Sequence, residues 1–498
     1  MKEVYSSIYF FLKSHAIVLL IFIIGLILRI WAAFLDPFLH DWDERFHALV
    51  ARNMMHHPFQ PMLRANPINN NYDPTQWCCS HIWLHKPPLF LWQMGLSMKT
   101  IGVSLFSMRL PSVLMGSIMI LLLYRIAFLC TGEKRIALIA ALLLAFSNFQ
   151  LQMIAGIKGM DHNDIAFGFY VLSGLWAYSE YLKNPTLLWG ILIGVLSGFA
   201  ILNKWLIGLL PYLGWGVNIL LQSDKQLLKK EINYLIKSVL VCCVIFLPWQ
   251  IYTWLTFPDL ARFEQSYNWR HITEALEGHS GSVFYYAEHF SDFFGHWVYY
   301  LIPIGIILML RDSSVNQRLL RAFLVESLFV LCFFSFIVKT KVDAHFFFVA
   351  PIFLLFLATA IYKSIQLKFI RDYSLILISI IIYFVLNPIY FSTHISNKNK
   401  VRNDRIFNTY IYQHLNEYIP DSSLVINMNA FEDIDVMFFN NKMTAYHFTL
   451  PEEDMQDLIQ KKIPIYAFTP HGKYKFPEWI ECYPYLKVIN LKLRTSAL

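Results

Sequence analysis

The sequence predicts an all-α polytopic membrane protein with a small α/β domain at its C-terminal end, outside the membrane. Of the 498 residues, 56% are hydrophobic, 15% are charged, and the mean hydropathy is +0.45. Soluble chains carry about 25% charged residues, so a water-soluble enzyme is excluded. From about residue 392 onward, apolar runs give way to short β-like runs that alternate with helical ones. The 42 Phe, 27 Tyr and 14 Trp exclude a disordered chain.

Long apolar runs mark the membrane spans. The first run, 15–35, is about 20 residues long, which is enough to cross a bilayer, and is interpreted as a signal anchor that stays in the protein. Similar runs follow at roughly 108–130, 136–152, 163–181, 187–203, 206–221, 235–255, 294–310, 322–338, 345–363 and 372–391. The fold class is therefore an all-α membrane protein with about 11 to 13 transmembrane helices.

Basic residues predict the orientation, because Lys and Arg collect in short cytoplasmic loops. Five alternate loops carry them: Lys134 and Arg135; Lys183; Lys225, Lys229 and Lys230; Arg311, Arg318 and Arg321; Lys368 and Arg371. They share one side only if the stretch 87–100 does not cross, so we expect it to lie as a helix on the outer surface. The chain then divides into a transmembrane domain, 1–391, with outer loops 36–107 and 256–293, and a periplasmic domain, 392–498.

Within the periplasmic domain the alternation of apolar residues predicts three strands and two helices. The strands are expected at 423–428, 443–448 and 464–469, and the helices near 405–418 and 452–461.

The densest group of polar side chains directly follows the first span, where residues 40–47 read His-Asp-Trp-Asp-Glu-Arg-Phe-His. A capping box is one explanation, with Asp41 as N-cap and Glu44 as its partner at the start of an amphipathic helix. Capping gives Asp43 no role, and an acidic residue at the membrane boundary is usually functional. We therefore favour Asp43 as a functional residue, with Glu44 beside it.

Two further outward segments carry polar groups. Residues 81–88 hold two His, Lys86 and a Pro-Pro breaker, and residues 158–164 place Asp161 and Asp164 between two spans. Membrane-interface anchoring and helix capping explain each segment alone. Helix ends at one membrane depth can also assemble a single site, with Asp161 in it. Basic residues at that depth are candidates to pair with an anionic group from the membrane: Lys86, Lys204, Arg262, Arg270, Lys339 and Lys341.

Carboxylates and imidazoles in these segments raise the question of a divalent metal. Oxygen and imidazole ligands suit Mg, Mn or Zn, and Asp41 and His85 are the candidate ligands. The spacing does not select among these metals.

Several of these motifs together resemble the C-type, multi-spanning glycosyltransferases that use polyprenyl-phosphate sugars, especially the bacterial protein O-mannosyltransferase and aminoarabinose transferase branch. The resemblance covers about residues 20 to 360, and its most specific parts are the acidic motif and the Lys-Pro-Pro segment. It rests on Asp43-Glu44 with Ala48, Ala51-Arg52 and Met54; Lys86-Pro87-Pro88 with Trp92; Phe106 and Arg109; Gly198, Leu202, Lys204 and Pro211; Leu247-Pro248-Trp249; and Lys339-Thr340-Lys341 before Pro351.

The resemblance implies a C-type glycosyltransferase fold and an inverting transfer of sugar from a polyprenyl phosphate to a hydroxyl of a protein, lipid or glycan. Asp43 would be the general base. Lys86, Lys204, Arg270, Lys339 and Lys341 would stabilise the departing phosphate. The location implied is a bacterial inner membrane, with the site facing the periplasm. Donor, acceptor and membrane lipids are the expected partners, and no nucleic acid is expected.

Two other functions remain open from the residues alone. A transporter or flippase would bind a lipid-linked sugar or other anionic cargo without transforming it, and its usual internal repeat is missing from this sequence. A lipid phosphotransferase would need a nucleophilic Ser or Thr beside a clearer metal cluster.

Overall fold

The computed structural model describes residues 2–65, 67, 77, 80–158, 162–204, 206–447, 456, 458–469 and 483–495, with side chains from His15 onward. These residues form two compact units. The first unit comprises 1–32, 112–154 and 162–388, and the second comprises 33–111, 155–161 and 389–498. The second unit begins its last segment near the predicted boundary at 392, but it also takes in the predicted outer loop 36–107.

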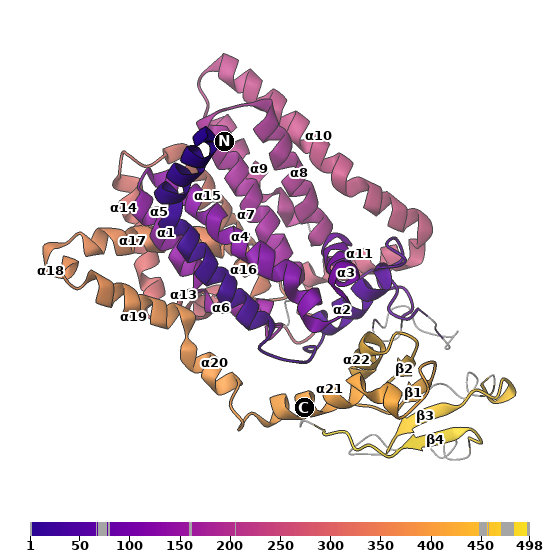
Figure 1. Cartoon of the computed structure of the whole chain (residues 1–498). Helices are drawn as coiled ribbons and strands as arrows, with labels where there is room; N and C mark the ends of the chain where they lie inside the picture. Colours follow the sequence, from indigo (N-terminus) through magenta and orange to yellow (C-terminus); the bar gives the residue numbers. More distant parts are fainter. Residues whose placement is uncertain are drawn as a thin grey trace. The chain divides into compact units, whose positions relative to one another are not determined.

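The first unit is a helical bundle (Figure 1). Its elements are α1 (Lys2–Ala33), α4 (Leu105–Thr131), α5 (Lys134–Ala145), α6 (Asn148–Ile154), α7 (His162–Lys183), α8 (Leu187–Asn203), η1 (Leu206–Leu209), α9 (Leu210–Leu220), α10 (Lys225–Thr256), α11 (Pro258–Thr273), α12 (Tyr285–Glu288), α13 (Phe290–Phe294), η2 (Val298–Leu301), α14 (Ile302–Arg311), α15 (Gln317–Cys332), η3 (Phe333–Ile337, a π-helix), α16 (Ala344–Phe347), α17 (Ala350–Ile365), α18 (Lys368–Arg371) and α19 (Ser374–Leu386).

Apolar helix length agrees with a membrane protein. Among the residues that the structure describes, five helices are long and apolar enough to cross a membrane, or six if α5 and α6, bent by 43° at their junction, form one span. Shorter apolar helices occupy four other predicted spans, at Leu187–Asn203, Leu206–Leu220, Val298–Arg311 and Ala350–Ile365. The predicted number of 11 to 13 spans stays a prediction.

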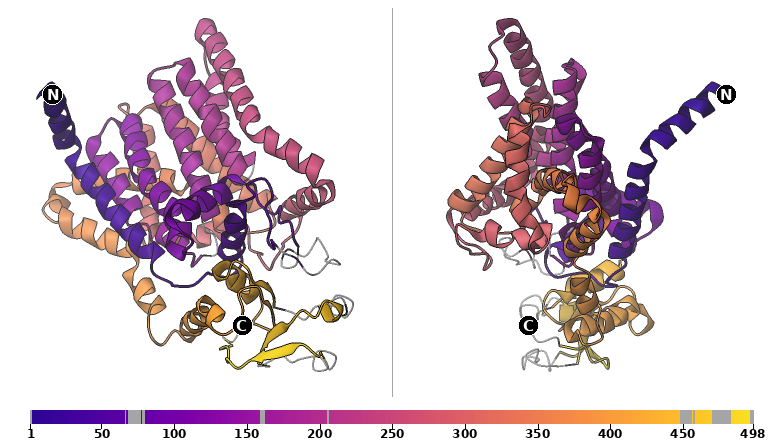
Figure 2. Two further views of the ribbon diagram at one scale, coloured as in Figure 1. Left: turned by 45° about the vertical axis from the view of Figure 1, so that its right-hand side comes forward. Right: turned by 90° about the vertical axis from the view of Figure 1, so that its left-hand side faces the viewer.

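Close helix packing in the first unit rests on small residues. Gly190, Gly194 and Gly198 recur every fourth residue on α8 and face α10, and a Cβ added at Gly194 would lie 2.3 Å from the carbonyl oxygen of Ser238. Figures 1 and 2 show α7, α8 and α10 running side by side. Buried Trp215 of α9 packs with rings of α7 in the core of this group. Such small-residue stripes let membrane helices approach closely.

The second unit combines helices with a parallel sheet (Figure 2). Its elements are α2 (Asp43–Met54), α3 (Leu89–Ile101), α20 (Pro388–His394), α21 (Lys400–Gln413), η4 (Leu415–Glu417), β1 (Leu424–Ile426), α22 (Glu432–Phe439), β2 (Thr444–Tyr446), β3 (Ile465–Phe468) and β4 (Leu486–Ile489).

The sheet has the strand order β2-β1-β3-β4, and all its pairs are parallel. Because parallel neighbours need a crossover connection, α22 links β1 to β2 and packs against β2 and α21. The three predicted strands are confirmed as β1, β2 and β3, whereas α22 and β4 were not predicted. Half of the predicted helix 452–461 lies outside the described residues.

Candidate functional site

The predicted acidic motif stands at the start of α2, in the second unit. The capping-box interpretation is wrong, because α2 begins at Asp43 and its N-cap is Trp42, an indole that carries no acceptor oxygen. Trp42 has φ 60° and ψ −110°, a backbone conformation that bulky residues rarely adopt. The half-buried Asp43 is the first residue of the helix, where the helix dipole favours a negative charge.

Glu44, the neighbour of Asp43, is buried and anchors the loop before α2. Arg109 donates to both of its oxygens, at 2.6 and 3.0 Å, and the backbone N–H of His40 donates to Oε2 at 2.8 Å. Arg109 lies in the first part of α4, 105–111, which belongs to the second unit. It also donates to the backbone carbonyls of Ala33, Asp36 and Phe38. Because both oxygens of Glu44 are engaged within the protein, this geometry favours a positioning role for Glu44 over direct contact with a substrate.

A third segment of the second unit closes over Glu44. Gly156 has φ +82°, and a Cβ added there would lie 2.5 Å from Oε2 of Glu44. Only a residue without a side chain can therefore approach the carboxylate this closely.

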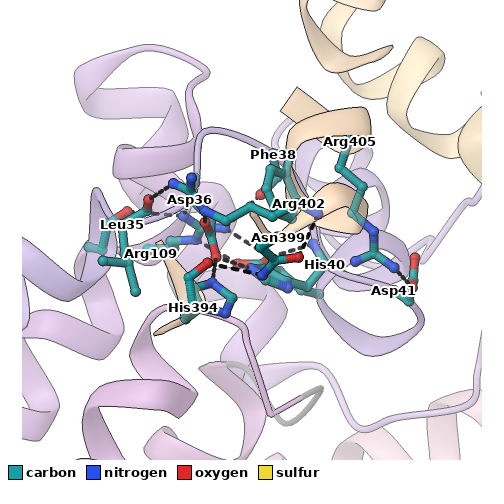
Figure 3. A network of polar contacts seen from close by, with 12 residues as sticks. Leu35, Asp36, Phe38, His40, Asp41, Arg109, His394, Asn399, Arg402 and Arg405 are labelled. Atoms are coloured by element: carbon teal, nitrogen blue, oxygen red, sulfur yellow. Dashed lines mark hydrogen bonds and ion pairs between the residues drawn. The ribbon is translucent and has the colours of Figure 1, made fainter. Parts of the chain in front are cut away.

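A second buried carboxylate, Asp36, ties the same loop to helices more than 350 residues further along the chain (Figure 3). Its oxygens contact Nε2 of His40 at 3.0 Å, Nε2 of His394 at 2.7 Å and Nε of Arg402 at 2.6 Å. Burial alone would raise the pKa of Asp36, but the hydrogen bonds from His394, His40 and Arg402 lower it well below its usual range. Burial lowers the pKa of His40, which favours the neutral imidazole.

Asp41, the predicted metal ligand, is instead paired with arginines. Its carboxylate contacts Arg405 of α21 and lies 3.2 Å from Arg45, and Arg45 Nε lies 2.6 Å from Asp435 of α22. Burial raises the pKa of Asp435 to about 7, against the lowering effect of Arg45. Two guanidinium groups at one carboxylate repel a cation, so Asp41 does not fit a metal site. Within the described residues, no three His, Cys, Asp or Glu side chains are placed to hold a metal ion.

His85 and Lys86 lie close to α2 in the second unit. The ring of Trp83 is 5.5 Å from the ring of His85 and 6.4 Å from that of Phe46, measured between centroids. The predicted Lys-Pro-Pro segment and the acidic motif are therefore brought together around a buried indole. Lys86 itself is half-buried.

The other four predicted phosphate-binding residues belong to the first unit. Lys204, at the end of α8, pairs with Asp164 in the first turn of α7. Exposed Arg270 pairs with Glu274 at 2.9 Å. The backbone N–H of exposed Lys339 donates to the carbonyl of Ile272, which joins the segment of Lys339 to the end of α11.

Lys341, two residues further, is buried, and its ammonium donates to the carbonyls of Phe334, Ser335 and Val338 at the end of the π-helix. Burial, and secondarily the charge of Lys339, lower the pKa of Lys341. The next helix, α16, packs on the first turns of α7, where the rings of Phe167 and Phe348 lie 5.1 Å apart. These four basic residues thus share one end of the first unit.

The remaining predicted catalytic residue, Asp161, lies outside the described residues. Sequence reasoning missed the residues that fix the loop before α2: Asp36, His394, Arg402, Arg405 and Asp435. Their only signal in the sequence is charge complementarity between a stretch with Arg402 and Arg405 and acidic stretches far away. A single sequence does not reveal which of many such pairs form.

Comparisons with known proteins agree with the fold. Residues 85–252 match the model of the dolichyl-phosphate-mannose-protein mannosyltransferase family. The structure of ArnT from Cupriavidus metallidurans bound to undecaprenyl phosphate superposes with a TM-score of 0.65 at 16% identity, covering 92% of this chain and 87% of that one. The archaeal oligosaccharyltransferase AglB from Archaeoglobus fulgidus gives a TM-score of 0.55 at 13% identity, covering 88% and 65%. The chain therefore has the polytopic membrane fold of these proteins.

Curated relatives are similar over part of their length. The undecaprenyl phosphate-alpha-4-amino-4-deoxy-L-arabinose arabinosyl transferase of Pseudomonas aeruginosa is 26% identical over 267 residues, which cover 49% of this chain and 42% of the relative. An uncharacterised protein of Aquifex aeolicus is 30% identical over 190 residues, 38% of this chain and 34% of that protein. The matches thus span less than half of these relatives. Together the comparisons confirm the resemblance to the polyprenyl-phosphate glycosyltransferases and to their aminoarabinose transferase branch.

Proposed function

We propose that this protein is an inverting glycosyltransferase that moves a sugar from a polyprenyl-phosphate donor to a hydroxyl of a protein, lipid or glycan acceptor on the outer face of the membrane. The observation that carries the proposal is Asp43, a half-buried carboxylate at the first position of α2, directly after a loop held by buried ion pairs. The curated arabinosyl transferases and the fold shared with ArnT support a transferase over a transporter or flippase.

In the proposed reaction, Asp43 accepts the proton of the acceptor hydroxyl while that oxygen attacks the anomeric carbon of the donor sugar. The bond from the anomeric carbon to the phosphate oxygen breaks, and the polyprenyl phosphate leaves with its electron pair. Lys86, Lys204, Arg270, Lys339 and Lys341 are the cations proposed to stabilise the phosphate. The isoprenoid chain of the donor keeps it in the bilayer, which accounts for a site at helix ends.

The proposal includes a location. The bent pair of α5 and α6, the four shorter apolar helices and α7 also cross the membrane. Together with the five long apolar helices they give 11 spans, within the predicted 11 to 13, in a bacterial inner membrane. The loop with Asp43 and the α/β part, 392–498, then face the periplasm, because the Lys-rich loops lie on the opposite side.

Asp43→Asn tests the role of the base. Asn keeps the size of the side chain, so a residue that only favours the helix start should lose about 0.3 to 1 kcal/mol of dipole energy and keep its activity. A base should lose its function, so we expect sugar transfer to fall by about a hundredfold or more, with near-normal thermal stability. The assay follows consumption of a polyprenyl-phosphate sugar by membranes that carry each variant.

Asp259→Asn is the matched control, because Asp259 is an exposed carboxylate in the first turn of α11. Its transfer rate should stay at the wild-type level. An Asp43→Asn enzyme with wild-type turnover would refute the assignment.

A further inference from the structure

The backbone immediately before Asp43 is held in an unfavourable conformation. Trp42 combines φ 60° with ψ −110°, and a bulky residue keeps such a conformation only where its surroundings impose it. Burial of its own side chain does not supply the restraint, because Trp42 is 55% exposed. Its ring rests on Phe431, at 4.6 Å between centroids, and on Phe46, at 6.2 Å.

Charged contacts flank Trp42 on both sides. Asp41, the preceding residue, is paired with Arg405 and Arg45. Arg45, three residues after Trp42, is paired with Asp435. The side chains of Arg45 and Asp435 are 5% and 2% exposed, so solvent hardly screens their pair. The ends of this chain of contacts, Arg405 and Asp435, come from α21 and α22.

Arg405 holds the loop at two points. Its guanidinium contacts Asp41, and its Cζ also lies 5.8 Å from the ring centroid of Phe38 (Figure 3). If Trp42 relaxed to a φ and ψ that bulky residues commonly adopt, the backbone would rotate at residues 41 and 42. The side chain of Asp43 would then point in another direction. Retaining the Asp41–Arg405 pair therefore retains the direction of Asp43.

We propose that Arg405 is a positioning residue for sugar transfer: through Asp41 it holds the backbone of Trp42 and thereby aims the carboxylate of Asp43 at the acceptor hydroxyl. This inference rests on the proposed role of Asp43 as the base. It assigns the α21 segment, distant in sequence, a direct part in the geometry of catalysis. A displacement of about 1 Å at a reacting group can cost about a hundredfold in rate, so the effect should appear in kcat.

The test compares Arg405→Gln, Arg405→Lys and Asp41→Asn in the full-length protein. Arg405→Gln should lower kcat by about a hundredfold and leave the KM for the polyprenyl-phosphate sugar unchanged, because a positioning residue acts through Asp41 and not on the donor. Arg405→Lys should recover most of the loss, since its ammonium can still pair with Asp41. Asp41→Asn should lower kcat in the same way, and the Asp41→Asn/Arg405→Gln double variant should be no worse than the more impaired single variant.

Arg494→Gln is the matched control. Arg494 pairs with Asp404, also on α21, at 3.7 Å, so its loss removes an ion pair of that helix without touching the loop before α2. This variant should keep the wild-type kcat. Thermal unfolding of each variant shows whether it is folded. If Arg405→Gln does not fold, the kcat of Asp41→Asn tests the positioning role instead.

The outcomes separate this inference from the proposed function. Wild-type kcat in folded Arg405→Gln, or in Asp41→Asn, overturns the positioning role even when Asp43→Asn is inactive. A fall in Arg405→Gln that Arg405→Lys does not recover, or that Arg494→Gln shares, also overturns it. Wild-type activity in Asp43→Asn instead overturns the proposed base, and the positioning role with it.

Discussion

Arginines hold the buried carboxylates in the loop between α1 and α2 and in the first turn of α2. Arg402 pairs with Asp36 and Arg109 with Glu44, and both pairs are shielded from solvent. Removing one partner of a buried pair leaves an uncompensated charge, whereas an exposed pair contributes little. These residues therefore fix the start of α2 more firmly than a helix cap would.

Asp36→Asn should lower the free energy of unfolding by about 3 kcal/mol at pH 7, because His394, His40 and Arg402 stabilise the carboxylate. The pKa of Asp36 is lower in the folded protein than its usual 3.8. The unfolded state thus binds the proton first, and the stabilisation, complete above pH 3.8, is lost as the pH falls below it.

Unfolding in detergent at a series of pH values should show the difference between wild type and Asp36→Asn narrowing below about pH 4. Asp421→Asn is the control, because Asp421 is largely exposed and 3.9 Å from Lys442. A difference that stays constant down to pH 3 would contradict the predicted ionisation of Asp36.

Removing the side chain of Lys339 should affect turnover alone, whereas removing that of Lys341 should affect both turnover and stability. Lys339→Ala, at an exposed side chain, should lower turnover by orders of magnitude with normal stability, since one donor to a charged transition state contributes roughly 3 kcal/mol. Lys341→Ala should also lower stability, because it leaves three carbonyls without their donor. Turnover and melting temperature of both variants check this.

If Ala variants of Lys86, Lys204, Arg270, Lys339 and Lys341 all keep near-normal turnover, the phosphate site has been misplaced.

Among the helices, α8 and α10 show how small residues set the distance between two elements. Gly190, Gly194 and Gly198 form a stripe along α8, and the carbonyl of Ser238 on α10 fills the space where a Cβ at Gly194 would stand. Lipid is as apolar as the helix surfaces, so close packing, and not the hydrophobic effect, holds such helices together.

Gly194→Ala should therefore destabilise the protein by about 1 to 3 kcal/mol, because the added methyl group forces α8 and α10 apart. Gly216→Ala on α9 is the matched control, since a Cβ there meets nothing within 4 Å among the described residues. It should be neutral or slightly stabilising, as Ala favours a helix. Equal thermal stability in detergent for the two variants would disprove the packing argument.

At the scale of the whole molecule, the distribution of charge determines the predicted topology. The basic loops lie on one side only if 36–107 and 392–498 lie on the other. The compact second unit contains 33–111 together with 389–498, so its parts must share one side of the membrane.

Single-Cys labelling in a background without other cysteines should reach position 430 from outside the cell and leave position 227 unlabelled. Position 227 lies in the first turn of α10, beside Lys229 and Lys230, and position 430 lies between β1 and α22. Both positions should react after the membrane is permeabilised. Outside labelling at 227 with none at 430 would reverse the topology.

The sequence by itself determined the class of the protein, most helix positions and the acidic motif. These are local properties: an apolar run long enough to cross a bilayer is visible in any 20-residue window. Strands β1 to β3 were also recognised from local alternation. α22 was missed, because three of its eight residues are acids. Two of these acids, Asp435 and Asp433, are buried against distant arginines, Arg45 and Arg64.

Only the tertiary structure decided how the motif is held. A local cap was one interpretation of Asp41 and Glu44, but the structure pairs Asp41 with Arg405, 364 residues away, and Glu44 with Arg109, 65 residues away. A capping box depends on spacing along the chain, whereas a buried ion pair depends on which segments fold together. The distant pairs hold the motif because their charges are buried. A charge removed from water is unstable without a partner, and here the fold supplies that partner from a distant segment.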